Sequence, residues 1–115
     1  LYMRIGGAWV TVDSTPGSFT AGGNLIVSAI GSGLRVAEGS NAKMGVVTLV
    51  AGTAVVSTTA VTANSRIFLT TQSLGTVAVA SAMAVTARTA GVSFTITASV
   101  GTDTSVVAWM LVEPS

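Results

Sequence analysis

The chain contains no cysteine and no histidine, and only four of its 115 residues are carboxylates. Without cysteine there can be no disulfide and no thiolate catalysis, so packing alone must stabilise the core. Without histidine, a Ser-His-Asp triad and a zinc site with histidine ligands are excluded. The sequence therefore favours a structural or binding protein over an enzyme. It predicts no catalytic residue, no metal ligand and no cofactor-binding residue.

Charged residues are also scarce. They make up 8% of the chain, compared with roughly 25% in typical soluble domains. The net charge is +1 and the cations are scattered, so the basic stripe that nucleic-acid binding needs is missing. So little charge would cover the surface of a monomer poorly, and we therefore expect identical copies to bury part of it.

Two uncharged runs, 44–65 and 67–87, are long enough for membrane helices, but Thr, Ser and Gly interrupt both of them. We therefore expect no membrane insertion. No signal peptide is visible, and the chain begins with Leu1 rather than Met. We interpret it as the end of a longer protein.

Small residues dominate what is present: Val, Ala, Thr, Ser and Gly account for 78 of the 115 residues. β-Branched residues favour strands, and no segment has a convincing helical period. The pattern predicts an all-β protein with strands at 1–5, 8–12, 25–30, 34–37, 46–50, 54–57, 66–72, 82–88, 93–99 and 105–112.

The clearest alternation lies at 93–98, where Phe94, Ile96 and Ala98 point to one face and hydroxyl residues to the other. Ala90-Gly91-Val92 predicts an antiparallel hairpin with the strand before it, and 101–104 predicts a turn. The last strand is apolar on both faces, which places it centrally in a sheet or at a subunit interface.

A change of composition at 39–45 divides the chain. We predict a leader of short β-hairpins at 1–43, corresponding to the end of a fibre shaft, and a compact β domain at 44–115. The leader is too short to form a core of its own, so it needs partners.

Several motifs resemble tailed-bacteriophage fibre and appendage proteins. Leu1-Tyr2-Met3-Arg4 followed by Gly6-Gly7-Ala8-Trp9-Val10 resembles an element of phage fibres, and 33–36 with 38–45 resembles the segment before their C-terminal β domain. The domain itself is represented by 44–45, 48–53, 61–70, 85–91, 93–97 and 103–114.

The resemblance implies a structural protein of the virion, in a tail fibre, head fibre or knob. It implies an antiparallel β-sandwich of jelly-roll-like type in a homotrimer, with other virion proteins and a host-surface glycan or protein as partners. A head decoration protein and a carbohydrate-binding module or trimerisation domain of a capsule depolymerase remain alternatives. Loops after Ser57, Gln72 and Ser99 are the expected host contacts.

Two short motifs have weak functional interpretations. Ser40-Asn41-Ala42-Lys43 matches the S-x-x-K pattern of penicillin-recognising acylases, but the accompanying motifs are absent and we predict a linker turn. Gly31-Ser32-Gly33 lacks the third glycine and the helix of a dinucleotide site, so it too predicts a turn.

The charged side chains leave further alternatives open. A glycosidase-like carboxylate pair would have to come from Asp13, Glu38, Asp103 and Glu113. Asp103 could contribute to a Ca²⁺ site, but more often such a residue caps its own turn. Arg66 and Arg88 either point to solvent or pair with Glu113 or Asp103.

The two tryptophans can be interpreted in two ways. Trp109 lies between apolar neighbours, which favours core or interface packing over stacking on a sugar. Trp9 stands beside Gly6 and Gly7, and its sequence context favours neither reading.

Overall fold

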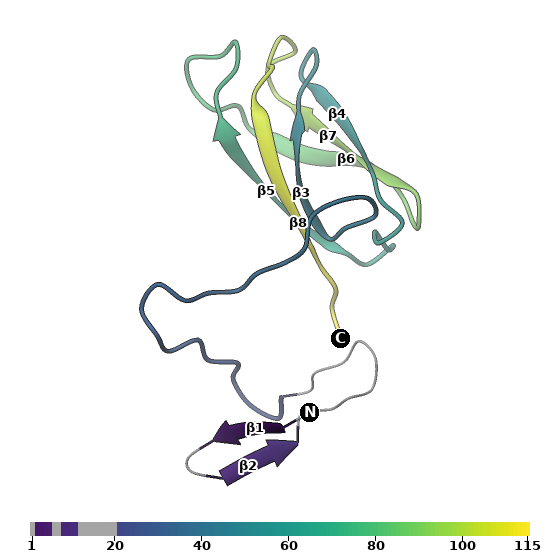
Figure 1. Cartoon of the computed structure of the whole chain (residues 1–115). Helices are drawn as coiled ribbons and strands as arrows, with labels where there is room; N and C mark the ends of the chain where they lie inside the picture. The colour runs from purple at the N-terminus through teal and green to yellow at the C-terminus, as the bar shows by residue number, and fades with distance from the viewer. Residues whose placement is uncertain (1, 6–7, 12–20) are drawn as a thin grey trace. The chain divides into compact units, whose positions relative to one another are not determined.

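The computed structural model describes residues 2–5, 8–11 and 21–115, which form eight strands (Figure 1). The chain divides into two compact units, Leu1–Leu34 and Arg35–Ser115, and each unit is considered by itself. Among the described residues, none belongs to a helix long and apolar enough to cross a membrane. The assignment of 1–43 and 44–115 as domains stays a prediction.

The first unit contains one hairpin. Strand β1 (Tyr2–Ile5) pairs antiparallel with β2 (Ala8–Thr11), which confirms the first two predicted strands. The strands predicted at 25–30 and 34–37 are wrong, because the backbone there forms no ladder. Leu25, Ile26 and Ile30 are instead exposed. Their β-branched and apolar side chains favour extended backbone, but a strand also requires a hydrogen-bonding neighbour.

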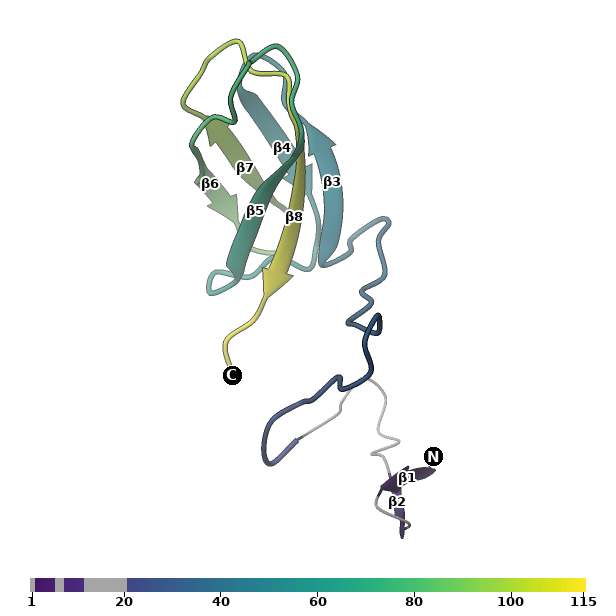
Figure 2. The same cartoon turned by 90° about the vertical axis from the view of Figure 1, so that its left-hand side faces the viewer.

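The second unit consists of two antiparallel three-stranded sheets (Figure 2). The first has the order β3 (Met44–Thr48), β8 (Val106–Val112) and β5 (Arg66–Ser73). The second has the order β4 (Thr53–Ser57), β7 (Ser93–Ala98) and β6 (Met83–Thr89). The all-β prediction is confirmed, and β7 and β8 are the central strands.

Most connections carry the chain from one sheet to the other. Strands β6 and β7 are the exception, since they form the predicted antiparallel hairpin, with Gly91 at φ +72° in its turn. At the β3–β4 crossing, Val50 and Thr53 exchange backbone hydrogen bonds across Ala51 and Gly52. A jelly roll has eight strands, and this unit has six, so the jelly-roll topology is not confirmed.

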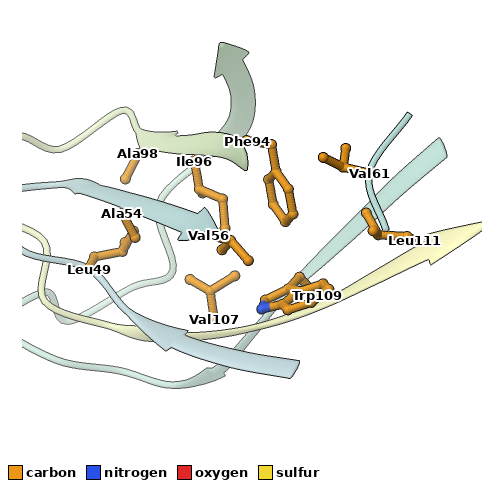
Figure 3. Packing of buried hydrophobic residues seen from close by; sticks show 10 residues of the cluster. All are labelled: Leu49, Ala54, Val56, Val61, Phe94, Ile96, Ala98, Val107, Trp109 and Leu111. Atoms are coloured by element: carbon orange, nitrogen blue, oxygen red, sulfur yellow. The ribbon is translucent and has the colours of Figure 1, made fainter. Parts of the chain in front are cut away.

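The inner faces of the two sheets share one core (Figure 3). The Phe94 ring of β7 meets the Trp109 ring of β8 edge to face, with centroids 5.4 Å apart at an interplanar angle of 78°. This arrangement suits the quadrupoles of the two rings. The buried apolar residues are Leu49, Ala54, Val56, Val61, Phe94, Ile96, Ala98, Val107, Trp109 and Leu111. The predicted packing of Trp109 in a core is confirmed.

A glycine makes room for this aromatic pair. Gly45 is the register partner of Trp109, and a Cβ built on Gly45 would lie 2.7 Å from Cζ2 of the indole ring. No side chain fits there unless the ring moves. The indole therefore lies directly against the backbone of β3.

Candidate interaction surfaces

The outer face of the β3–β8–β5 sheet is apolar and has no cover within its unit. Side chains alternate along each strand, so this face comprises the residues between the core positions. Phe68 is 56% exposed and Val46 is 47% exposed. The outward residues are Met44, Val46, Thr48, Val106, Ala108, Met110, Val112, Arg66, Phe68, Thr70 and Ser73, with Gln72 beside them at the β5 bulge. We call these residues the apolar face.

A shallow hollow of about 270 Å³ opens on the apolar face. Met44, Val46, Phe68, Ala108 and Met110 line it. Monomeric proteins keep such contiguous apolar patches small, and larger ones mark interaction sites. The hollow has the chemistry of a site for apolar side chains.

The outer face of the β4–β7–β6 sheet is rich in hydroxyl groups, although Val55, 60% exposed, also lies on it. Its outward residues are Thr53, Val55, Ser57, Ala84, Thr86, Ala87, Thr89, Ser93, Thr95 and Thr97. Thr86 and Thr97 form a cross-strand hydrogen bond between their hydroxyl oxygens, 2.7 Å apart. Water can solvate this face, which we call the hydroxyl face.

Three loops meet at the end of the unit where β5 and β7 finish. The Thr76 amide donates to Oγ1 of Thr104 at 3.0 Å, and the Thr76 hydroxyl donates to the Thr102 carbonyl at 2.5 Å. The Gly52 amide donates to the carbonyl of Asp103 at 2.9 Å. The β3–β4 turn and the loops 74–82 and 99–105 are thereby joined, and we call them the loop end.

The loop after Ser57, the third of the expected contact loops, lies apart from the loop end. The Thr58 hydroxyl donates to the Ala42 carbonyl at 2.8 Å, just before β3 begins. The Thr62 hydroxyl donates to Glu113, just after β8 ends, also at 2.8 Å. This loop therefore packs at the opposite end of the sheets from the loop end (Figure 1).

Asp103 is buried in the loop end, with only 1% of its surface exposed. Its Oδ1 accepts from the Ser105 amide at 2.8 Å and from the Ser105 hydroxyl at 2.5 Å. The Ser105 hydroxyl, followed by that of Ser81, holds the pKa of Asp103 below its ordinary value of 3.8, against the effect of burial. The Ser81 hydroxyl is buried and has no partner at hydrogen-bond distance.

The capping interpretation of Asp103 is therefore confirmed. Its amide donates to the Val100 carbonyl at 3.1 Å, which closes the predicted turn. Within the described part of the chain, no group of three acidic, histidine or cysteine side chains could hold a metal ion. The carboxylate serves the turn, and its neighbours are hydroxyl groups.

Glu113 organises the opposite end of the unit. It accepts hydrogen bonds from Ser65 and Thr62 and forms an ion pair with Lys43, whose Nζ lies 3.3 Å from Oε1. The Ser65 hydroxyl is the main cause of a pKa of Glu113 below its ordinary value of 4.5, and the Thr62 hydroxyl and Lys43 contribute further. The contacts tie the start of β3 to the end of β8.

The S-x-x-K segment forms the predicted linker turn, in which the Ala42 amide donates to the Gly39 carbonyl at 3.3 Å. Lys43 pairs with Glu113 and not with Ser40. Of the two alternatives for Arg66 and Arg88, exposure to solvent holds for both, and within one chain neither forms an ion pair with Glu113 or Asp103. Arg88 donates to the Ser65 carbonyl at 2.8 Å and to the Ala63 carbonyl at 3.2 Å. Arg66 is exposed and donates to the Asn64 carbonyl at 2.8 Å.

A bulge directs Arg88 to these carbonyls. The register of β6 against β7 shifts between Val85 and Ala87, after which Arg88 pairs with Phe94. Paired residues share a face, so the bulge turns Arg88 to the inner side, toward the loop 58–65. Charge and hydropathy in the sequence gave no signal for this contact.

The remaining candidates are separated from one another. Asp103 and Glu113 lie at opposite ends of β8, so they cannot form a glycosidase-like pair within one chain. Gly31-Ser32-Gly33 lies in a turn in which the Ser32 amide donates to the Ala29 carbonyl at 3.1 Å, as predicted. Asp13 and the side chain of Trp9 lie outside the described residues.

A comparison with known families identifies the second unit. Residues 41–112 match the family described as "K1 capsule-specific polysaccharide lyase, C-terminal domain". The chain belongs to this family. No curated protein and no solved structure matches it significantly.

The segment that matches the lyase C-terminal family begins just before β3 and ends with the last residue of β8. It therefore contains both sheets, the apolar face and the loop end, and excludes the β1–β2 hairpin. This agrees at a coarse level with the predicted resemblance to the C-terminal β domains of phage appendages.

Proposed function

We propose that this chain is the non-catalytic C-terminal assembly domain of a trimeric phage appendage, a tail fibre or tail spike on the virion. The uncovered apolar face, in a domain of the lyase C-terminal family, carries the proposal. Burying that face against identical copies would remove its apolar surface from water.

The family description favours one form of this appendage, a capsule depolymerase whose catalytic part lies upstream of this domain. Assembly is then the contribution of this chain. Its chemistry supports that division, since the sequence has no histidine or cysteine. Of its four carboxylates, Asp103 and Glu113 already accept hydrogen bonds from neighbouring hydroxyls.

The loop end is the proposed contact with the host surface. It lies at the end of the unit opposite that at which the chain enters β3 and leaves β8. Its threonine and serine hydroxyls can donate and accept hydrogen bonds, as a glycan or a protein loop requires. A tail attachment and a head attachment predict the same chemistry at this end.

Light scattering coupled to size-exclusion chromatography tests the assembly. The expected mass is three times the 11.4 kDa of one chain. A mass of 11.4 kDa over the whole accessible concentration range would contradict the proposal. Antibody labelling of purified particles for electron microscopy then distinguishes a tail position from a head position, and complete absence from particles would contradict the virion role.

A further inference from the structure

We infer that the apolar face packs against second copies of this chain in a ring, with the β5 margin of each copy beside the β3 margin of the next. The inference rests on the proposed function, and it adds the surface, the neighbour and the direction of packing. Three observations on the second unit carry it: the composition of the apolar face, its hollow, and the charges at its two margins.

The composition of the apolar face suits contact between identical copies. Its central strand, β8, contributes no polar side chain to it, only Val106, Ala108, Met110 and Val112. Copies can therefore approach without burying an unpaired charge, which would be costly. The hydroxyl face, by contrast, would leave many hydrogen-bonding groups to be satisfied in such a contact.

The hollow gives the contact a place to interlock. It lies between Val46 on β3 and Phe68 on β5, above Ala108, the smallest side chain of the central strand's outer row. Two methionines, Met44 and Met110, also line the hollow, and their unbranched side chains adapt to irregular gaps. Side chains of a neighbouring copy can fill this space at interior packing density.

Opposite charges lie at opposite margins of the apolar face. Arg66 is the first residue of β5, an edge strand, and it is exposed. Glu38 lines hollows beside Met44 and Val46 of β3, the other edge strand, and it is also exposed. Among the described residues, the one ion pair joins Lys43 to Glu113, so neither Arg66 nor Glu38 is engaged in an ion pair.

This distribution sets the direction of packing. When the β5 margin of one copy meets the β3 margin of the next, Arg66 lies next to Glu38 of its neighbour. Each contact is then heterologous, and repetition by a threefold rotation closes a ring. Contacts between two β5 margins would instead bring like charges together, which electrostatic complementarity disfavours.

Charge reversal in the full 115-residue chain tests the inference. Arg66→Glu and Glu38→Arg should each raise the concentration at half-assembly by about tenfold, because each reversal places like charges together at every contact of the ring. The double variant should return to within about threefold of the original value, since it restores opposite charges in exchanged positions. Both single effects should shrink in high salt.

Arg35→Glu is the control, since it makes the same charge change outside both sheets. Thermal unfolding measured by circular dichroism verifies that each variant still folds. If the original chain is trimeric and the double variant does not regain the original concentration at half-assembly, the inference is wrong while the proposed function stands. An equal effect of Arg35→Glu would also overturn it, and a face-to-face dimer would overturn both the ring and the trimer.

Discussion

The two central strands, β7 and β8, follow the same inward pattern and differ outward. Both alternate buried and half-buried residues, and their inward side chains meet in one core. Outward, β7 presents Ser93, Thr95 and Thr97, whereas β8 presents valine, alanine and methionine. The period-two alternation therefore determines which face of a strand enters the core. The residue types in the other row indicate whether the outer face is suited to contact with water.

Glutamate at matched outward positions should separate the two faces most strongly. Ala108→Glu on β8 should abolish the proposed trimer, because an unpaired charge in the proposed buried contact would cost about 3–5 kcal/mol. Thr95→Glu on β7 should leave the trimer intact, since its side chain stays in water. Light scattering measures the molar mass of both variants. Loss of the trimer in Thr95→Glu alone would reverse the assignment of the faces.

Two phenylalanines test the inner side against the outer side. Phe94→Ala should lower the free energy of unfolding by about 3–5 kcal/mol, because it removes the fully buried partner of Trp109. Phe68→Ala should change the stability of the dissociated subunit by less than about 1 kcal/mol and weaken assembly instead. Urea unfolding at low protein concentration measures both. Equal losses would show that Phe68 belongs to the core of a single subunit.

The buried carboxylate of Asp103, just before β8, should stabilise the subunit through its hydrogen bonds as well as through its charge. Asp103→Asn should destabilise the subunit by about 1–3 kcal/mol, because it removes the charge that strengthens both Ser105 hydrogen bonds to Oδ1 and buries an amide NH₂ in place of Oδ2. Denaturant unfolding gives the value. Asn41→Asp, in an exposed turn, provides a control for substitutions between these two residue types. A loss no larger than that of the control would contradict the role of Asp103.

Acid should weaken the unit through both ends of β8. The pKa values of Asp103 and Glu113 lie below their ordinary 3.8 and 4.5, so their stabilisation is fully present above about pH 4.5. It is lost as the pH falls through the folded-state values, where both carboxylates take up protons. The melting temperature of the original chain should therefore decline in this range. Asp103→Asn should decline less steeply, and an identical slope would refute the linkage.

Glu113→Gln should have the smallest effect, less than about 1 kcal/mol. Its ion pair with Lys43 is partly exposed, and such pairs contribute little. The glutamine carbonyl can still accept from one of the two hydroxyls, Ser65 or Thr62, and the glutamine NH₂ can donate to the oxygen of the other. Thermal melting should show a small shift, matched by Lys43→Met. A much larger loss in Glu113→Gln would mean that the hydroxyl contacts require the full charge.

Local pattern predicted much of the second unit. The hairpin at 90–92 and the alternation at 93–98 follow from short-range backbone preferences and from side-chain period, and both are present. The apolar character of both rows at 105–112 predicted a central strand or a subunit interface, and β8 is central in its sheet. The same reasoning failed at 25–30, where an apolar, β-branched run finds no neighbouring strand among the described residues.

Long-range contacts could not be predicted in this way. Glu113 meets Lys43 across 70 positions and Ser65 across 48, and nothing in their local sequence specifies these partners. Arg88 reaches backbone carbonyls because of a bulge between Val85 and Ala87, and the residue types around that bulge do not predict it. The loop after Ser57 has turn chemistry like the other loops, yet its contacts place it at the opposite end.

The sequence by itself determined an all-β chain of small side chains without cysteine or histidine, because residue type and period two act over a few neighbouring positions. The tertiary structure alone decided which strand pairs with which, and therefore that one sheet carries an apolar face with Arg66 and Glu38 at its margins. Those arrangements depend on contacts between residues far apart in the chain, where many registers satisfy the same local pattern and only joint packing selects one.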